Sequence, residues 1–206
     1  MIVDERLVTY INSLDTGNTA MLDQIEREAT ADYVPIIRKE MQSFLKFLLA
    51  MKKPARILEV GTAVGFSAIL MAEYDPVPCQ ITTIENYEKR IPIARENFKR
   101  AGKEAQIALL EGDAAEVLKT LEGPYDFIFM DAAKGQYIHF LPKDGVLVSD
   151  NVLQDGDVIE SRFAVTRRNR TIHKRMREYL YTLTHSEELV TAVLPVGDGI
   201  TLSTRR

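Results

Sequence analysis

Apolar residues recur at helical spacing through the first 53 residues of the chain. The three stripes comprise Leu7, Tyr10, Ile11 and Leu14, then Leu22, Ile25 and Ala29, then Ile37, Met41, Phe44, Leu45, Leu48 and Leu49. Because a helix returns to the same face every three to four residues, this spacing predicts three amphipathic helices. Pro35 suits the entry to the third helix. We expect an N-terminal helical extension over residues 1–53.

From Arg56 onward, short β-rich runs alternate with helical stretches. The runs are ARILEV, QITTIE, QIALLEG, YDFIFM, GVLVSD, LVTAVLPV and GITLST. Helices are predicted over residues 66–73, 88–100, 114–121 and 161–184. Alternation of this kind predicts an α/β fold, with a parallel sheet and helices on both faces.

The end of the chain departs from this alternation. The last two runs are separated by Gly-Asp-Gly, which predicts an antiparallel pair and a mixed seven-stranded sheet. The connector 131–145 is close to the minimum for a parallel crossover. Either its helix has hardly more than one turn or residues are absent from the connector. We expect one domain, residues 1–206.

Composition narrows the class of protein. Hydrophobic residues make up 46% of the 206, enough for a core. A net charge of -4 and a pI near 5.5 argue against a surface that is basic everywhere. Cys79, the single cysteine, fits a reducing cytosol. The N-terminus lacks the apolar segment of a signal peptide, and no run of about 18 apolar residues occurs, so we expect a cytoplasmic protein.

Polar side chains follow two neighbouring strands of the predicted sheet. Asp131 and Lys134 come after YDFIFM, and Asp150 and Asn151 come after GVLVS. Parallel strands end at one edge of a sheet, where carboxylate and amide oxygens suit Mg²⁺, Ca²⁺ or Mn²⁺. Alternatively, each aspartate only caps a following helix. The histidines have no metal-ligand spacing: His139, His173 and His185.

A glycine-rich loop lies between the first strand and its helix, in ILEVGTAVGFSAI. Gly61 and Gly65 allow the backbone to approach a ligand, but neither a dinucleotide fingerprint nor an ATP-binding P-loop is present. Glu85 ends the second strand and is placed to accept the hydroxyls of a ribose. Asp113 follows the third strand and suits an adenine amino group, a helix cap, or both.

Over residues 34–206 the motifs ILEVGTAVGFSAI, TTIE, EGDA, MDAAKGQY, SDNVL and PVGDGITLSTRR resemble the divalent-metal-dependent, S-adenosylmethionine-dependent O-methyltransferases. That family includes catechol and caffeoyl-CoA enzymes. The resemblance implies a Rossmann-like class I methyltransferase fold and a homodimer formed through the N-terminal helices and terminal strands. The implied cofactor-binding residues are Val34, Glu59, Gly61, Ser67, Glu85, Asp113, Ala114 and Asp131. The implied Mg²⁺ ligands are Asp131, Asp150 and Asn151, with Lys134 as general base.

This chemistry agrees with the residue types. A hydroxyl is a weak nucleophile until its proton leaves, and a chelated Mg²⁺ lowers its pKa. A lysine near that cation is expected to have a lowered pKa and to accept the proton. Attack on the sulfonium methyl group then needs mainly positioning.

A basic segment, RFAVTRRNRTIHKRMREY, bears on the methyl acceptor. Seven positive charges precede its first acidic residue: Arg162, Arg167, Arg168, Arg170, Lys174, Arg175 and Arg177. The candidate RNA-binding residues are Arg167, Arg168, Arg170, Lys174 and Arg175. The alternative is a solvated helix face.

With the terminal Arg205 and Arg206, this segment is most similar to the bacterial tRNA 5-hydroxyuridine methyltransferases, which make 5-methoxyuridine at the wobble position. The 5-hydroxyl and O4 of the uracil are neighbouring oxygens that can chelate Mg²⁺ as a catechol does. Tyr137 and Phe163 are candidates to stack on an unpaired base, or pack within the fold.

Two further hypotheses remain open at this point. The same catalytic residues would serve an O-methyltransferase of small catechol-like or hydroxycinnamoyl compounds. A non-catalytic nucleoside-binding module is the third, and it predicts behaviour that does not depend on a metal.

Overall fold

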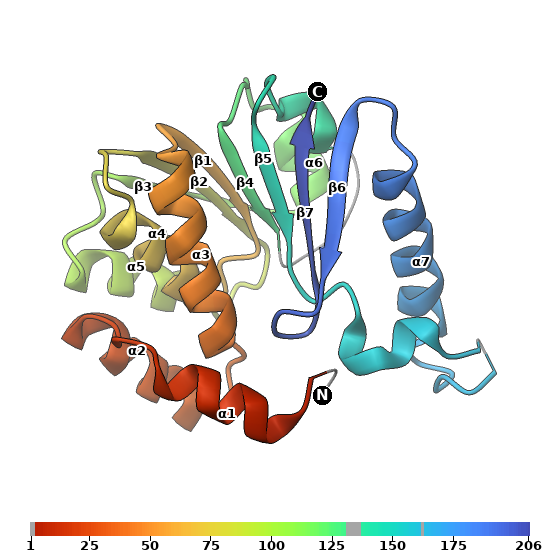
Figure 1. The fold of residues 1–206 in the computed structure, drawn as a ribbon. Coiled ribbons are helices and arrows are strands. Elements are labelled where there is room, and N and C mark those ends of the chain that lie inside the picture. Colours follow the sequence, from red (N-terminus) through yellow and green to blue (C-terminus); the bar gives the residue numbers. More distant parts are fainter. Residues whose placement is uncertain (1–2, 131–136, 162) are drawn as a thin grey trace.

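Seven strands form one mixed sheet in the computed structural model, which describes residues 3–130, 137–161 and 163–206 (Figure 1). Their order across the sheet is β3-β2-β1-β4-β5-β7-β6. The strands are β1 (Arg56–Val60), β2 (Gln80–Glu85), β3 (Ile107–Glu111), β4 (Phe127–Met130), β5 (Val146–Ser149), β6 (Leu189–Leu194) and β7 (Ile200–Arg205). Strands β1 to β5 are parallel, and β7 is antiparallel to both β5 and β6. The predicted mixed sheet with an antiparallel C-terminal pair is confirmed.

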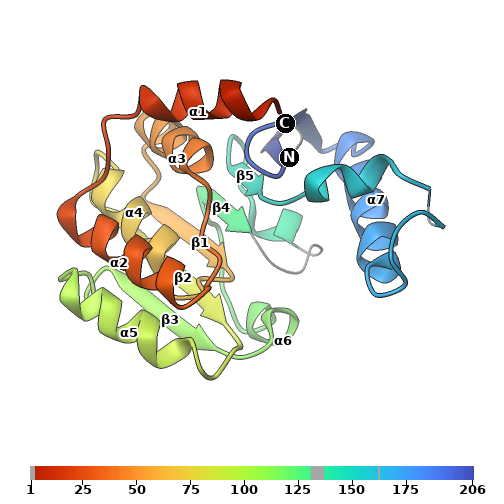
Figure 2. The ribbon, with the colours of Figure 1, turned by 90° about the horizontal axis from the view of Figure 1, so that it is seen from below.

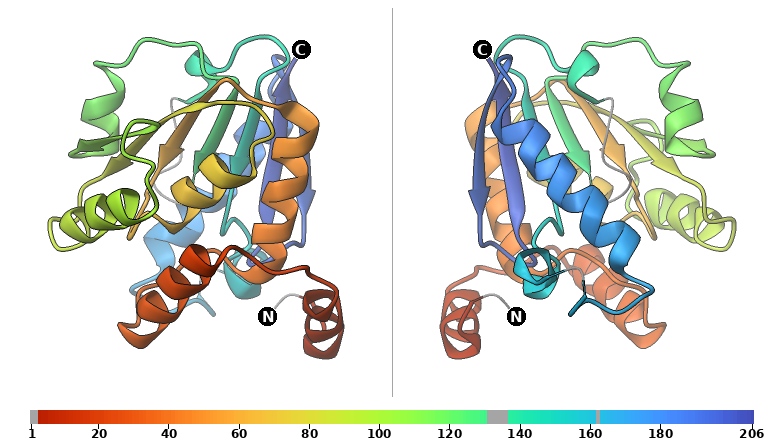
Figure 3. Two further views of the ribbon diagram at one scale, coloured as in Figure 1. Left: turned by 90° about the vertical axis from the view of Figure 1, so that its left-hand side faces the viewer. Right: turned by 90° about the vertical axis from the view of Figure 1, so that its right-hand side faces the viewer.

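Helices cover both faces of the sheet. One face carries α3 (Lys39–Lys52), α4 (Phe66–Tyr74) and α5 (Ile91–Arg100), and the other carries α6 (Ala114–Leu118) and α7 (Arg170–Thr184) (Figure 3). The first two helices, α1 (Glu5–Ser13) and α2 (Ala20–Ala31), lie at the edge where the parallel strands end (Figures 1 and 2). None of the described helices has both the length and the apolar character needed to cross a bilayer.

Adjacent strand residues supply two separate apolar clusters. Ile57 belongs to the cluster that contains residues of α2 to α5, whereas the next residue, Leu58, belongs to the cluster with α6 and α7. Phe127 and Ile128 of β4 divide in the same way. Because both faces are covered, the central strands are apolar throughout, as parallel strands buried on two sides are.

The predicted helix over residues 161–184 is wrong at its N-terminal end. Residues 163–169 form turns, and α7 begins at Arg170. Ala164 N–H bonds to the Ser161 carbonyl and Asn169 N–H to the Thr166 carbonyl, so the backbone groups are satisfied in short turns. These turns leave Val165 buried and Phe163 exposed.

Three other predicted boundaries also shift. Helix α5 begins at Ile91, later than predicted, because the backbone after β2 first turns to bond the Glu85 carboxylate. Pro92 then suits the first turn of the helix. Strand β6 ends at Leu194 because Pro195 has no N–H for the ladder. Helix α6 ends at Leu118, three residues early, and is followed by a turn in which Leu121 N–H bonds to the Leu118 carbonyl.

The connector between β4 and β5 is short, as expected. Its described part contains a single-turn 3₁₀ helix, η1 (Tyr137–Phe140). A second 3₁₀ segment, η2 (Gln154–Ile159), follows β5. The described residues that follow both strands therefore form short 3₁₀ segments and irregular backbone.

The turn between β6 and β7 packs against the segment that follows β5. Gly199 N–H donates to the Val196 carbonyl at 2.9 Å, and Gly199 has φ +85°. A β-carbon at this position would collide with the Leu153 side chain. Glycine is therefore required both by the backbone conformation and by the packing.

We predict that Gly199→Ala lowers the free energy of unfolding by about 1–3 kcal/mol more than Gly17→Ala. Gly17 is a matched control, since it has the same φ of +85° and its β-carbon would meet no atom within 4 Å. Urea denaturation of both variants measures the difference. Equal losses would show that packing against Leu153 contributes nothing.

Candidate functional site

The glycine-rich loop between β1 and α4 is held in left-handed backbone. Gly61 has φ +92°, Ala63 has φ +49° and Gly65 has φ +88°. A β-carbon on Gly65 would lie 2.6 Å from the Phe98 ring, so α5 packs directly against the loop. Asn97, also on α5, donates from Nδ2 to the Val64 carbonyl at 2.8 Å. A non-glycine residue in this conformation, Ala63, is a form of strain that clusters at functional sites.

The Glu59 carboxylate lies fully buried beneath this loop. Its Oε1 accepts a hydrogen bond from Ser67 Oγ at 2.5 Å, and its Oε2 accepts one from Thr83 Oγ1. Glu59 and Thr83 are paired residues of β1 and β2, and Ser67 lies in the first turn of α4. A buried polar group needs such hydrogen-bond partners. Glu59 thus connects two strands to the helix after the loop, and its predicted contact with a cofactor stays a prediction.

Glu85 ties the end of β2 to the same loop. Its carboxylate accepts three backbone hydrogen bonds, from Ala63 at 2.8 Å, Asn86 at 2.9 Å and Tyr87 at 2.8 Å. Two of these reach Oε1 and one reaches Oε2. Since a carboxylate offers roughly four acceptor positions, Oε2 can accept one further hydrogen bond. The side chain therefore both shapes the loop and suits a ligand hydroxyl.

Three of the remaining predicted cofactor residues are in the described part of the chain. Asp113 caps α6, accepting from Ala115 N–H at 2.9 Å, and is exposed; Ala114 is the first residue of that helix. Val34 lines a groove of about 420 Å³ between α2 and α5, together with Val64 of the loop. Asp131 lies outside the described residues.

The candidate metal ligands begin where β4 and β5 end. The last residues of these strands, Met130 and Ser149, are partners in the parallel pair, and Asp150 N–H bonds to the Met130 carbonyl at 2.8 Å. Asp150 is 8% exposed and accepts from Asn151 N–H at 2.7 Å. Asn151 is exposed and has φ +57°, a conformation that asparagine tolerates.

Asp131 and Lys134, the other residues of the predicted metal site, lie outside the described residues. Their convergence with Asp150 and Asn151 stays a prediction. Within residues 3–130, 137–161 and 163–206, no three side chains of His, Cys, Asp or Glu are grouped to hold a metal.

Helix α7 supports the end of β5 from behind. Tyr179 and Ser149, both buried, share a hydroxyl–hydroxyl hydrogen bond of 2.5 Å. Burial raises the pKa of Tyr179 to about 12, although the bond to Ser149 acts in the opposite direction. This contact was not predicted from the sequence. Its only signal was the apolar stripe of α7, in which Tyr179 lies between Met176 and Leu183.

The basic segment is exposed over most of its length. Arg167, Arg168, Lys174, Arg175 and Arg177 are exposed. Helix α7 begins within this segment, at the lower edge of Figure 1, where the parallel strands also end. The structure therefore brings these cations to the same end of the molecule as the candidate site.

Four further residues named in connection with the acceptor are Arg162, Phe163, Arg170 and Tyr137. Arg170 is half-buried, and its Nε donates to the Val165 carbonyl at 3.3 Å. Arg162 lies outside the described residues. Phe163, one of the two stacking candidates, is 86% exposed. The other, Tyr137, begins η1, but its side chain is outside the described part of the chain.

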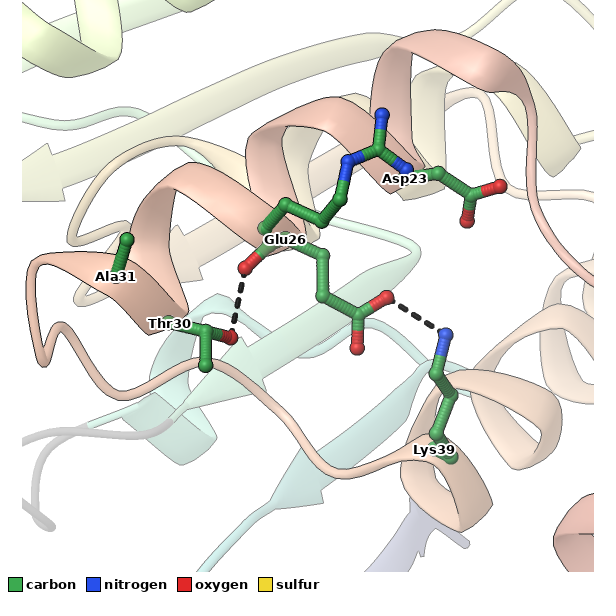
Figure 4. Close-up of a pocket in the computed structure, with 6 residues that line it drawn as sticks. Asp23, Glu26, Thr30, Ala31 and Lys39 are labelled. Atoms are coloured by element: carbon green, nitrogen blue, oxygen red, sulfur yellow. Dashed lines mark hydrogen bonds and ion pairs between the residues drawn. The ribbon is translucent and has the colours of Figure 1, made fainter.

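A second hollow, of about 480 Å³, lies between α2 and the start of α3 (Figure 4). Lys39 pairs with Glu26 at 2.6 Å, and Thr30 Oγ1 donates to the Glu26 carbonyl at 2.8 Å. The hollow is lined by Asp23, Glu26, Arg27, Thr30, Ala31 and Lys39. None of these is a predicted site residue, so this hollow is separate from the candidate site.

The sheet and the glycine-rich loop after its first strand define a Rossmann-like methyltransferase. The chain belongs to the O-methyltransferase family, whose sequence profile matches residues 12–206. It is 36% identical over 128 residues to a catechol O-methyltransferase of Niastella koreensis, which covers 57% of this chain and 58% of that enzyme. It is 33% identical over 180 residues to caffeoyl-CoA O-methyltransferase 2 of Populus trichocarpa, covering 79% of this chain and 71% of that one.

Among solved structures, the S-adenosylhomocysteine-bound methyltransferase PaMTH1 of Podospora anserina is similar throughout. The TM-score is 0.88 at 27% identity, covering 98% of this chain and 94% of that one. The protein is therefore an S-adenosylmethionine-dependent methyltransferase of the catechol and caffeoyl-CoA type. The hypothesis of a non-catalytic module is set aside.

We predict that one phenol of the folded protein resists ionisation until about pH 12. Because the folded-state pKa of Tyr179 is raised above the ordinary value of about 10, its contribution to stability is complete below pH 10 and is lost as the pH rises toward 12. Absorbance titration at alkaline pH measures this. The late-ionising phenol should vanish in Tyr179→Phe and persist in Tyr181→Phe, whose ring is 65% exposed. Identical titrations of the two variants would contradict the assignment.

Proposed function

We propose that this protein carries out Mg²⁺-dependent methylation of 5-hydroxyuridine at the wobble position of tRNA, giving 5-methoxyuridine. The distribution of charge is the observation that supports tRNA as the methyl acceptor. Residues 161–177 hold seven of the chain's 26 basic residues and none of its 30 acidic residues. In a chain with a net charge of -4, such a cluster at the site end of the sheet favours a polyanionic acceptor. We place this activity in the cytoplasm.

The described residues fit S-adenosylmethionine. The loop 61–65 has the left-handed glycines that close backbone approach requires. The hydroxyl of Thr62 is buried in this loop and has no hydrogen-bond partner among the residues that the structure describes. Glu85 would accept a ribose hydroxyl through Oε2, and Asp113 would face the adenine. Glu59 and Ser67 would support the loop from beneath. The bound cofactor supplies the methyl group.

The donor set at the end of β5 fits a hard divalent cation. Asp150 and Asn151 would hold it together with Asp131, since carboxylate and amide oxygens are the ligands that Mg²⁺ prefers. A bound cation supplies Lewis acidity, which lowers the pKa of the acceptor hydroxyl. Lys134 would accept the hydroxyl proton at Nζ, and the protein's remaining task is to align the acceptor oxygen with the methyl group.

The exposed ring of Phe163 suits the uracil. A base in the anticodon loop is unpaired, so it can be turned into a pocket and stacked on an aromatic side chain. Phe163 lies at the start of the basic segment, which would contact the phosphates on either side of that base. The neighbouring 5-hydroxyl and O4 would both face the cation.

A small catechol-like or hydroxycinnamoyl acceptor is the second candidate. The names of the relatives support it, since they include catechol and caffeoyl-CoA O-methyltransferases. A coenzyme A thioester also carries phosphates, so the basic segment would serve it as well as tRNA. A plain catechol has no phosphate and would not need these residues. Catechol is therefore the small acceptor that separates the two uses of the segment.

We predict that wild-type protein transfers labelled methyl groups to tRNA containing 5-hydroxyuridine and that excess chelator abolishes the transfer. Replacing the exposed cations together, in Arg167→Gln/Arg168→Gln/Arg175→Gln, should raise KM for tRNA roughly tenfold or more and flatten its salt dependence. Methylation of catechol should be unchanged. Arg170 is left intact because it bonds the Val165 carbonyl.

The matched control is Lys53→Gln/Lys99→Gln/Lys119→Gln, which removes the same charge from exposed positions outside the segment. If both triple variants lost tRNA methylation equally, the overall charge of the protein would explain the loss, and the basic segment would have no specific role. If tRNA is no substrate and caffeoyl-CoA or catechol is methylated instead, the second candidate replaces the first.

We also propose that the protein is a homodimer formed through α1 and α3. Helix α1 has no buried residue, and its apolar residues Leu7, Tyr10 and Ile11 are exposed, as is Leu14 at its C-terminal cap. Phe47 and Met51 of α3, the helix that α1 contacts, are also exposed. A helix of nine residues is marginal unless its apolar face is covered.

We predict that Leu7→Lys/Ile11→Lys sediments with the mass of one chain, whereas wild type sediments with the mass of two. The urea denaturation slope should stay that of a folded protein, because neither side chain contributes to the core of one subunit. Arg6→Glu, an exposed change on the same helix, is the control and should leave the dimer intact. A wild-type mass of one chain would refute the proposal.

A further inference from the structure

The segment after Asp150 has an unusual concentration of left-handed backbone. Asn151 has φ +57°, Gln154 has φ +48° and Asp155 has φ +53°, and Gly156 follows at φ +101°. Asparagine and aspartate tolerate this conformation, whereas for Gln154 it costs about 1–2 kcal/mol. It persists only where the surroundings hold it. Something outside residues 151–156 must therefore fix their path.

Part of the support comes from the turn between β6 and β7. Val152 N–H donates to the Gly199 carbonyl at 2.8 Å, and Leu153 N–H donates to the Asp198 carbonyl at 3.0 Å. These bonds hold the first residues after Asn151. They do not reach Gln154 and Asp155, where the backbone is left-handed again.

Further support comes from an ion cluster that joins three distant parts of the chain. The Arg38 guanidinium, immediately before α3, lies 2.5 Å from Asp198 Oδ1 and 3.5 Å from Asp155 Oδ1. One guanidinium thus bridges the segment after β5 to the turn between β6 and β7. Burial raises the pKa of Asp198, and Arg38 counters this by favouring its ionised form. We refer to Arg38, Asp155 and Asp198 as the Arg38 cluster.

We infer that the Arg38 cluster positions the metal ligands of this enzyme. It fixes residues 151–156, and through them the exposed amide of Asn151 and the neighbouring Asp150 carboxylate. The inference rests on the proposed metal-dependent function. None of the three side chains is a proposed ligand, so they are positioning residues, acting through the backbone that they hold. Residues that orient metal ligands in this way typically account for about 10–100-fold in metal affinity.

Two variants with opposite charge changes separate positioning from simple electrostatics. Asp198→Asn removes a negative charge near the site, whereas Arg38→Gln removes a positive one. A purely electrostatic effect would weaken cation binding in the first and strengthen it in the second. Positioning weakens it in both. Lys119→Gln, which breaks a 2.7 Å surface pair with Glu116, is the matched control.

Two quantities are measured. The first is Mn²⁺ binding, followed through the electron paramagnetic resonance signal of the free ion, and the second is the Mg²⁺ concentration that gives half-maximal methyl transfer. Both should shift by about tenfold in Asp198→Asn and in Arg38→Gln, with kcat at saturating Mg²⁺ nearly unchanged. Affinity for S-adenosylhomocysteine, measured calorimetrically without metal, should stay within about twofold in every variant, as the glycine-rich loop is held by other contacts. Lys119→Gln should match wild type.

Unchanged or tighter Mn²⁺ binding in Arg38→Gln overturns the inference. A parallel loss of S-adenosylhomocysteine affinity also overturns it, because the cluster would then be supporting the fold in general. Failure of the proposed metal dependence is recognised in wild type itself, which would bind no Mn²⁺ and remain active in chelator; the inference falls with it.

Discussion

The buried carboxylate of Glu59 is the interaction on which the site's geometry depends. Three elements meet at it: β1 carries the side chain, β2 supplies the Thr83 hydroxyl, and α4 supplies the Ser67 hydroxyl. A carboxyl group with no exposed surface tolerates little displacement of its hydrogen-bond partners, because an unsatisfied polar group is costly in the interior. The distance between the two strand ends and the helix is thereby fixed. The glycine-rich loop spans that fixed distance, and Glu85 and Asn97 then set its path.

The two halves of the proposed site are built in different ways. Its cofactor half comes from β1, β2 and β3 and the loops that follow them, so its main contacts join neighbouring elements. Its acceptor half depends on residues far apart in the chain. Ser149 is held by Tyr179, and residues 151–156 are held by Arg38 and the turn at 197–199. The first half suits a ligand common to a family, and the second allows the acceptor to change.

The same division explains what could be predicted from the sequence. Strand runs and the glycine-rich loop are local patterns, so the sheet, its antiparallel end and the placing of Glu85 and Asp113 follow from periodicity and turn residues. The start of α7 was wrong because a run rich in arginine has helical propensity, whereas tertiary packing turned residues 163–169 to bury Val165. The Arg38 cluster joins residues 117 and 160 positions apart, and no local pattern marks such a contact.

The position of β7 between β5 and β6 has a consequence for the molecule's behaviour at high concentration. Strand β5, which leads to Asp150, is paired on both sides and offers no open ladder. The sheet has two edges, β3 and β6, and the edge nearer to β5 falls on β6. The sequence of β6, LVTAVL, has no charge and no proline, and it exposes Val190 and Val193. An edge without charges is a template for the addition of another strand, the step that begins aggregation. Because β7 lies between β5 and β6, the strand that leads to Asp150 is kept away from this aggregation-prone edge.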